Sequence, residues 1–233
     1  MKRPVYSLIP AKGKSTQIKN KNLLKIHGRS LLEIAIKSSI NSNVIDKTFV
    51  SSESKKILNI AKYYNCNLIK RPKILSSKKA LGINVIKHFL KSIEVIAKKK
   101  NPIIVILQTT SPLRSINNIK NSVKLFKKKK LKYLMSVRKN ETSPYKDMII
   151  KNSKLISITS KKNVIMNRQS FPQTYKPNGA IFILSYKNFI KDKSFLNKCH
   201  PFIMNKINSL DVDSLNDFNL AKKYFKRVHA KKI

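Results

Sequence analysis

Acidic residues are scarce in this chain: its 233 residues include 10 Asp and Glu against 51 Lys and Arg, for a net charge of +41. The chain also lacks tryptophan and has only four glycines and two cysteines. Cys66 and Cys199 lie in unrelated contexts, which argues against a disulfide framework or a cysteine zinc site, so we expect a reduced, cytoplasmic setting. No apolar run approaches the roughly 20 residues of a membrane span, and we expect no signal peptide.

The excess of positive charge raises the question of nucleic-acid binding, because such a field attracts polyanions. Nearly all of the excess is lysine, accompanied by many asparagines and isoleucines, the residues that AT-rich codons supply. It is spread along the chain, and no zinc-finger, RNP-type or basic-arm motif accompanies it. We therefore expect no specific nucleic-acid partner, although a nucleic-acid binder remains an alternative.

Strand-like and helix-like segments alternate along the first half of the chain. Apolar runs predict strands at Val5–Ile9, Val44–Val50, Asn67–Ile69 and Ile103–Leu107. Helical periodicity predicts helices beginning at Ser30, with Glu33 completing a capping box, and over about Ile57–Tyr64 and Ile83–Lys98. This order predicts an α/β fold: a three-layer, open, mostly parallel sheet covered by helices on both faces.

The second half of the chain continues the pattern with one interruption. It predicts a helix over Ile116–Lys128, strands at Tyr133–Val137 and Ala180–Leu184, and a last helix capped by Ser214. The polar stretch between the two strands, Glu141–Gln173, contains short β-like pieces. We interpret the chain as one domain, 1–233, with a small lobe inserted at 139–175.

The loop after the first strand, Ile9–Leu23, reads IPAKGKSTQIKNKNL. A strand, a polar lysine-rich turn and a helix suit the binding of phosphates, through backbone N–H groups and ammonium groups. The loop matches neither the Walker nor the G-x-G-x-x-G pattern. Ligands of open α/β sheets bind beyond the carboxyl ends of the strands. There we expect this loop to meet the turn at Ser51–Glu53 and the loop that begins at Gln108.

Three of the ten acids fall within seven residues, at Asp211, Asp213 and Asp217. Asp211 and Asp213 are two apart on an extended segment and should point to the same side. Paired carboxylates suit Mg²⁺, which usually takes one or two of them and completes its shell with water and phosphate. The alternative is a helix cap at Asp213. We favour the metal site because acids are rare here and a phosphate-type loop is present.

Six motifs in order resemble the acylneuraminate cytidylyltransferases, the CMP-sialic acid synthetase family. They are AKGKSTQIKNKNL (Ala11–Leu23), VSSES, RPKIL (Arg71–Leu75), LQTTSPLR (Leu107–Arg114), PNGAIF (Pro177–Phe182) and DVDSLND (Asp211–Asp217). The resemblance implies a Rossmann-like fold of the nucleotide-diphospho-sugar transferase type. It also implies a reaction of CTP with a nine-carbon α-keto sugar acid, giving a CMP-sugar and pyrophosphate. The IKNKN and RPKIL segments look like the branch that activates bacterial nonulosonic acids.

The resemblance also implies residue roles and a homodimer formed through the inserted lobe. Catalytic roles fall to Lys12, Lys21 and Asp211; nucleotide binding to Ala11, Lys12, Gly13, Ser15, Lys21, Asn22 and Arg71; substrate binding to Gln108, Arg168 and Asn178; and Mg²⁺ binding to Asp211 and Asp213. Arg168 would reach a neighbouring subunit's site from the insert.

The first loop departs from the family pattern. Lys12 stands where the family has arginine, and Lys14, Thr16 and Gln17 stand where it has glycine, lysine and glycine. Lysine keeps the charge of arginine but loses its bidentate fork. Two alternatives to the synthetase therefore stay open: a nucleotide-binding pseudoenzyme of the same fold, or a Kdo-type cytidylyltransferase.

Overall fold

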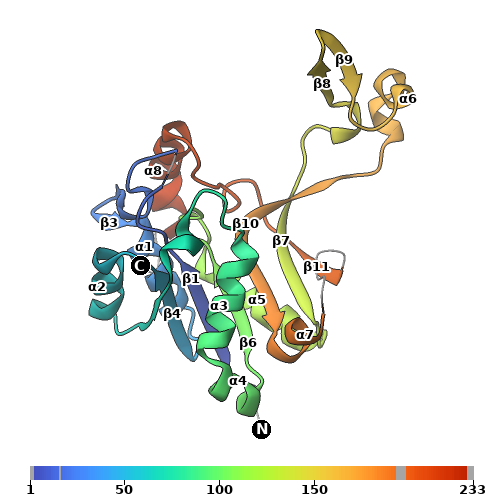
Figure 1. Cartoon of the computed structure of the whole chain (residues 1–233). Coiled ribbons are helices and arrows are strands. Elements are labelled where there is room, and N and C mark those ends of the chain that lie inside the picture. The colour runs from blue at the N-terminus through green and yellow to red at the C-terminus, as the bar shows by residue number, and fades with distance from the viewer. Residues whose placement is uncertain (1–2, 16, 193–197, 230–233) are drawn as a thin grey trace.

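A seven-stranded sheet with helices on both faces forms the body of the protein (Figure 1), in a computed structural model that describes residues 3–15, 17–192 and 198–229. In spatial order the strands are β11 (Cys199–Ile203), β7 (Tyr133–Lys139), β10 (Tyr175–Ser185), β6 (Ile103–Leu107), β1 (Val5–Pro10), β4 (Lys47–Ser52) and β5 (Asn67–Lys70). Strand β10 runs antiparallel to both β6 and β7, and every other pairing is parallel. The prediction of an open, mostly parallel sheet is confirmed.

Two apolar layers cover the sheet. One face packs against α1 (Leu31–Ile40), α2 (Lys55–Tyr63) and α5 (Ile116–Lys128). The other packs against α3 (Gly82–Ser92), α4 (Glu94–Lys100) and α7 (Tyr186–Lys191). Side chains of β1 alternate between the layers, with Val5 and Ile9 in the first and Tyr6 and Leu8 in the second, as the two-residue period of a strand requires.

A third apolar cluster lies beyond the carboxyl ends of the strands. It contains residues of α8 (Leu215–His229), α1 and the small hairpin of β2 (Lys25–Ile26) and β3 (Arg29–Ser30). Val212 is fully buried in this cluster, so the residues on either side of it, Asp211 and Asp213, are held at that end of the sheet.

Capping boxes begin two helices where the sequence predicts them. Ser30 Oγ accepts from Glu33 N, and the Glu33 carboxylate accepts from Ser30 N, at the start of α1. Asp217 N donates to Ser214 Oγ, and the Asp217 carboxylate accepts from Ser214 N, at the start of α8. Each box satisfies backbone N–H groups that a helix start leaves unpaired.

The structure differs from the prediction in three segments. The second strand begins at Lys47, not Val44, because the preceding residues form a turn in which Asp46 accepts from Val5 N at 2.6 Å. The helix predicted over Ile83–Lys98 is two helices, α3 and α4, that divide at Ile93. Strand β11 was not predicted, and its pairing with β7 adds an edge to the sheet.

The insert stands apart from the body on extensions of β7 and β10 (Figure 1). Its elements are β8 (Met148–Lys151), β9 (Lys154–Ser157), α6 (Lys161–Ile165) and the short turns η3 (Pro144–Lys146) and η4 (Arg168–Ser170). Strands β8 and β9 pair as a two-stranded hairpin, separate from the main sheet.

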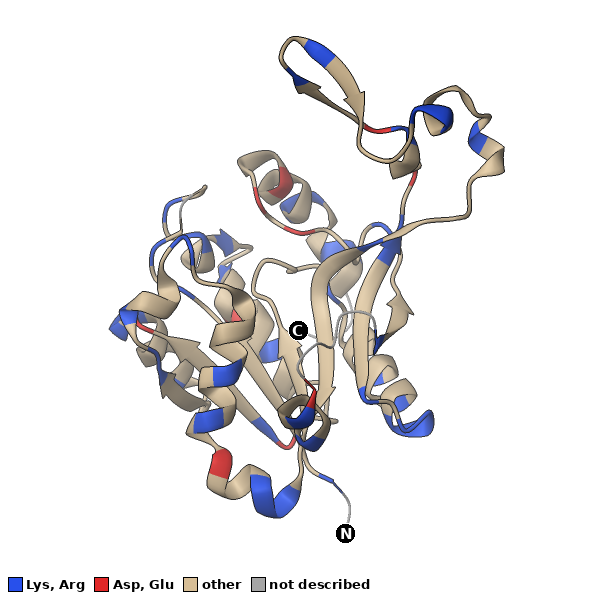
Figure 2. Ribbon diagram, turned by 45° about the vertical axis from the view of Figure 1, so that its right-hand side comes forward, with Lys and Arg blue, Asp and Glu red and all other residues tan. Residues whose placement is uncertain are grey.

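Basic residues occur on every part of the ribbon, whereas acidic residues are few (Figure 2). Across the described ranges, no helix has both the length and the apolar character that crossing a bilayer requires.

Candidate active site

The loops that leave β1, β4 and β6 meet at the carboxyl end of the sheet, as predicted. A cavity of about 250 Å³, called the cleft here, is lined by the loops that leave β1, β5 and β6. Its polar lining comes from Lys12, Ser15, Lys21, Asn22, Arg71, Ser76, Ser77, Gln108, Thr109 and Thr110, and its apolar floor includes Leu8, Val85 and Ile106. Six of the ten residues predicted to bind nucleotide or substrate therefore face one cavity: Lys12, Ser15, Lys21, Asn22, Arg71 and Gln108.

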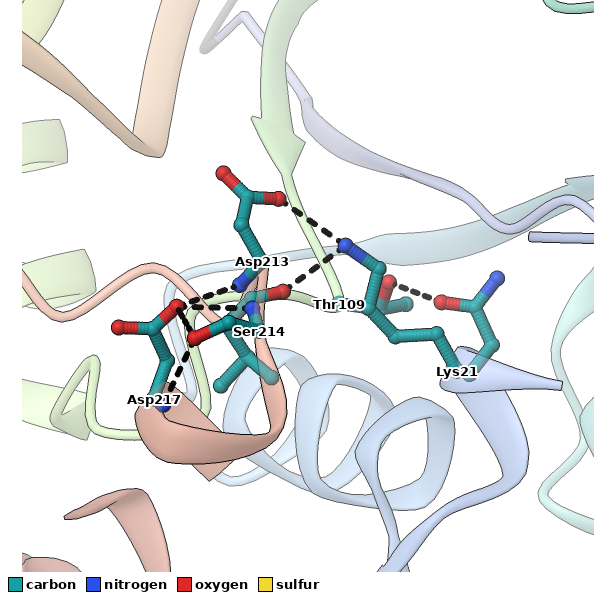
Figure 3. A network of polar contacts seen from close by, with 7 residues as sticks. Lys21, Thr109, Asp213, Ser214 and Asp217 are labelled. Carbon is teal, nitrogen blue, oxygen red and sulfur yellow. Dashed lines mark hydrogen bonds and ion pairs between the residues drawn. The ribbon is translucent and has the colours of Figure 1, made fainter. Parts of the chain in front are cut away.

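Lys21 joins the cleft to the aspartate segment. The side chain is buried, and its Nζ donates to Val212 O at 2.8 Å and to Asp213 Oδ1 at 3.0 Å (Figure 3). Two segments 192 positions apart in the chain thus share one ammonium group. A lysine near the front of the chain therefore contacts the aspartate segment near its tail.

A second cavity, called the aspartate cavity here, lies next to this contact and has a volume of about 600 Å³. Three acidic and three basic side chains are among its lining residues: Asp211, Asp213, Asp217, Arg138, Lys176 and Lys206. Asp211 and Asp213 both line this cavity while Val212 is buried behind them. The expected same-side placement of the two aspartates is therefore present.

The donor set fits a magnesium ion. Oδ1 of Asp211 is buried and accepts no hydrogen bond from the described residues. Burial raises the pKa of Asp211; a hydrogen bond from Thr110 acts against that rise, and repulsion from Asp213 adds to it. Within the described ranges, no three His, Cys, Asp or Glu side chains form a metal-binding group. A cation here would thus need phosphate and water to complete its shell, which is how Mg²⁺ commonly binds.

Asn22 ties the first loop to the loop after β6. Its Nδ2 donates to Lys12 O at 2.7 Å, and its Oδ1 accepts from Thr109 Oγ1 at 2.6 Å. The side chain is buried. These contacts fix the backbone at Lys12, which points its side chain into the cleft.

Glu53 and Thr109 are site residues that the sequence analysis did not single out. Glu53 Oε1 accepts from Gly13 N at 2.7 Å, and its Oε2 accepts from Ser76 Oγ at 2.5 Å and from Arg71 at 3.3 Å. The sequence signal that could have identified Glu53 is the scarcity of acidic residues, since Glu53 is one of only ten in the chain.

Ala11 and Gly13 have structural positions in the loop. The Ala11 side chain is buried in the core, and its N–H donates to Ser51 O at 3.0 Å. A β-carbon at position 13 would come within 2.8 Å of Ser54 Cβ, closer than side chains approach, so glycine is required there. Thr16, a departure from the family pattern, lies outside the described residues.

Asn178 lines the aspartate cavity, but its amide is engaged within the protein. Its Oδ1 accepts from Ser136 Oγ and Ala180 N, and its Nδ2 donates to Ser209 Oγ at 2.9 Å. The neighbouring Gly179 has φ +71° at an irregularity in β10. This geometry suits a residue that positions the strand beside Asp211. Direct contact between Asn178 and a substrate stays a prediction.

Arg168 lies in the insert, away from the cleft. It donates to Glu141 O and lines a third cavity together with Arg138, Gln173 and Lys206. Lys206 also pairs with Glu141 at 2.6 Å. Because Arg138 and Lys206 line both this cavity and the aspartate cavity, a basic surface connects the base of the insert with the aspartates.

Comparison with known proteins finds relatives over most of the chain. A cytidylyltransferase family model matches residues 6–208. The chain is 30% identical over 223 residues to an N-acylneuraminate cytidylyltransferase of Escherichia coli O18:K1:H7, a match that covers 95% of this chain and 52% of that protein. It is 24% identical over 228 residues to a pseudaminic acid cytidylyltransferase of Campylobacter jejuni, covering 95% of this chain and 96% of that protein.

A similar fold occurs in CMP:2-keto-3-deoxy-manno-octonic acid synthetase solved with CTP, with a TM-score of 0.69, 11% identity, and coverage of 96% of this chain and 99% of that one. The chain spans about half the length of the N-acylneuraminate cytidylyltransferases that it matches. The family match over most of the chain nevertheless stands: the protein belongs to the cytidylyltransferase family.

Proposed function

We propose that the protein activates a sialic acid-like nonulosonic acid with CTP, giving a CMP-sugar and pyrophosphate for cell-surface glycan synthesis in the cytoplasm. The observation that carries the proposal is the contact between Lys21, which lines the cleft, and Asp213, which lines the aspartate cavity. Membership of the cytidylyltransferase family supports CTP as co-substrate. The names of the relatives, N-acylneuraminate and pseudaminic acid cytidylyltransferases, support an acidic nine-carbon sugar.

The proposed reaction is one displacement at phosphorus. The anomeric hydroxyl oxygen of the sugar bonds to the α-phosphorus of CTP, the bond from that phosphorus to the bridging oxygen breaks, and pyrophosphate leaves with the electron pair. The hydroxyl proton passes to solvent. Such a step depends on alignment and on neutralising negative charge. Lys12 and Lys21, both in the cleft, are placed to hold the triphosphate.

Asp211 and Asp213 would hold Mg²⁺, which would neutralise part of the phosphate charge when bound. The buried, unpartnered oxygen of Asp211 supports this assignment, because a buried carboxylate oxygen without a donor is unfavourable until a cation binds it.

The aspartate cavity suits the sugar acid. Arg138, Lys176 and Lys206 supply positive charge in the cavity that the aspartates also line, and arginine and lysine are the side chains that recognise carboxylates. Gln108 lies in the cleft on the β6 side, where it would contact the sugar next to the nucleotide.

We also propose that the insert forms a homodimer. The β8–β9 hairpin exposes Ile149, Ile150, Leu155 and Ile156, and an isolated two-stranded hairpin is marginally stable in water. Large exposed apolar groups on such a hairpin point to an interface. A second copy of the chain would cover these apolar side chains. It would also bring its Arg168 near the aspartate cavity of the first copy.

Pyrophosphate release from CTP, with Mg²⁺ and a panel of nonulosonic acids, tests the proposed activity. We expect release with at least one member of the panel and loss of more than about 10²-fold in kcat for Asp211→Ala with Asp213→Ala, because the site then lacks its cation ligands. The exposed Asp147→Ala, in the insert, is the matched control and should keep its rate.

Three other outcomes would contradict the proposal in different ways. Activity that survives the double substitution would contradict the metal role. CTP binding without turnover for any sugar would favour the pseudoenzyme. Turnover with Kdo alone would favour the Kdo-type enzyme.

A further inference from the structure

Glu53 lies behind the cleft, at the point where three segments of its wall come together. The carboxylate follows β4 and is largely buried, with 15% of its side chain exposed. It accepts hydrogen bonds from the first loop, through Gly13 N, and from the segment after β5, through Arg71 and Ser76. Arg71 and Ser76 line the cleft, whereas Glu53 is not among its lining residues.

The segment after β5 has few other ties to the body. Outside the regular elements, the backbone hydrogen bonds of residues 73–80 are local: they run from Leu75 N to Pro72 O, from Ser77 N to Ile74 O and from Ala80 N to Ser77 O. Ile74 is 76% exposed. The hydrogen bond from Ser76 to Glu53 therefore holds the middle of this segment against the first loop.

Among the described residues, one N–H donor of the Arg71 side chain has no hydrogen-bond acceptor. Its side chain is 4% exposed, one terminal nitrogen meets Glu53, and its Nε is buried without an acceptor among the described residues. A buried donor without an acceptor is unfavourable. Its position on the cleft wall indicates that a ligand supplies the missing acceptor.

We propose that Glu53 is a positioning residue for nucleotide recognition. It holds the first loop and residues 71–76 together, so that Arg71 and the first-loop lysines contact the same bound nucleoside triphosphate. The inference rests on the proposed function only in taking a nucleotide as the ligand. Burial by itself would raise the pKa of Glu53, but hydrogen bonds from Ser76 and Gly13 and the charge of Arg71 keep that pKa below its ordinary value. The carboxylate is therefore charged at neutral pH.

The test compares matched variants for Mg–CTP binding by calorimetry and for the kinetics of pyrophosphate release. Glu53→Gln keeps the size but places an amide NH₂ beside Arg71 or Ser76. We expect its Kd and KM for CTP to rise by about 10- to 100-fold, the effect of losing one charged hydrogen bond. The kcat at saturating CTP and the KM for the sugar should change by less than about threefold. Glu94→Gln, which changes an exposed carboxylate at the start of α4 that does not line the cleft, is the control.

A second pair of variants keeps the test independent of any folding defect in Glu53→Gln. Ser76→Ala removes a donor to the carboxylate, and Ser76→Thr retains the hydroxyl. We expect weaker CTP binding for the alanine variant and near-native binding for the threonine variant. Amide hydrogen exchange of residues 73–80 should be faster in Glu53→Gln and in Ser76→Ala than in the native protein.

The outcomes separate this inference from the proposed function. Native protein that fails to bind Mg–CTP contradicts the proposed function, and hydrogen exchange then still tests whether Glu53 holds the segment. Native protein that binds CTP, with Glu53→Gln and Ser76→Ala binding equally well, overturns the positioning role and leaves the proposed function standing. Loss of thermal stability with unchanged Kd would likewise overturn it, because it would show a purely structural ion pair.

Discussion

Asp211 illustrates how a single carboxylate can oppose the stability of the protein that carries it. Its pKa is raised, chiefly by burial, so the folded state releases the proton less readily than the unfolded chain does. Between the two pKa values the folded state binds more protons, and stability therefore falls as the pH rises through that range. Above that pH range, the stability that the raised pKa of Asp211 takes from the folded protein has been lost in full. The free protein carries this penalty at neutral pH.

We therefore expect Asp211→Asn to raise the Tm of the nucleotide-free protein at pH 7 by about 2–4 °C, if the penalty is on the order of 1 kcal/mol. The difference in Tm between Asp211→Asn and the native protein should disappear as the pH falls below the range in which carboxyl groups ordinarily titrate. Calorimetry over a series of pH values measures this difference. Asp213→Asn is the matched comparison and should be neutral or destabilising, since it weakens the partner of buried Lys21. A lower Tm for Asp211→Asn at neutral pH would contradict the argument.

At the scale of elements, the β8–β9 hairpin carries the dimer proposal. Ile150 is 77% exposed on β8. Replacing it with lysine should leave the fold of the body intact, because β8 pairs with β9 in a hairpin that is separate from the main sheet. We expect Ile150→Lys to convert a dimer to a monomer at micromolar concentration in sedimentation experiments. Lys151→Glu on the same hairpin, which changes charge without removing apolar surface, is the comparison.

Equal sedimentation of the native protein and Ile150→Lys as monomers would contradict the dimer proposal. If Arg168 acts in a neighbouring site, Ile150→Lys should also lose sugar turnover while it keeps CTP binding in the cleft. This combination distinguishes a lost partner from a lost fold.

Elements with strong local signals could be predicted from the sequence, and those that depend on distant contacts could not. The apolar run of β6 and the Ser30 capping box are both where the sequence places them. The division between α3 and α4 at Ile93 has no glycine or proline to announce it. Strand β11 contains Pro201 and pairs with residues more than 60 positions earlier, a contact that local periodicity does not contain.

The candidate site shows the same division. The lysine loop and the aspartate pair have recognisable motifs. Glu53 lies in a segment that looks like an ordinary turn, and its partners are 40 positions before it and 23 after it. Only the folded chain brings these groups to one carboxylate.

For the whole molecule, the net charge of +41 predicts an affinity for polyanions that depends on salt. Lysines and arginines occur on all parts of the ribbon (Figure 2), so duplex DNA should bind without a preferred face. We expect any affinity measured by fluorescence anisotropy to fall by about 10³-fold or more between about 50 and 200 mM salt, if six or more phosphates are contacted. Tight binding that persists at high salt would instead support a dedicated nucleic-acid surface.

Strands β7 and β10 belong to the main sheet at one end and carry the insert at the other. Along β10, the residues between these ends include Gly179, where an added β-carbon would lie 3.5 Å from Asp211 Oδ2. Because β10 is one strand from the insert to the main sheet, a tilt of the insert would be carried by the same strand that borders the carboxylate. The orientation of the insert and the surroundings of Asp211 are therefore linked through the backbone of β10, including the residues from Pro177 to Gly179.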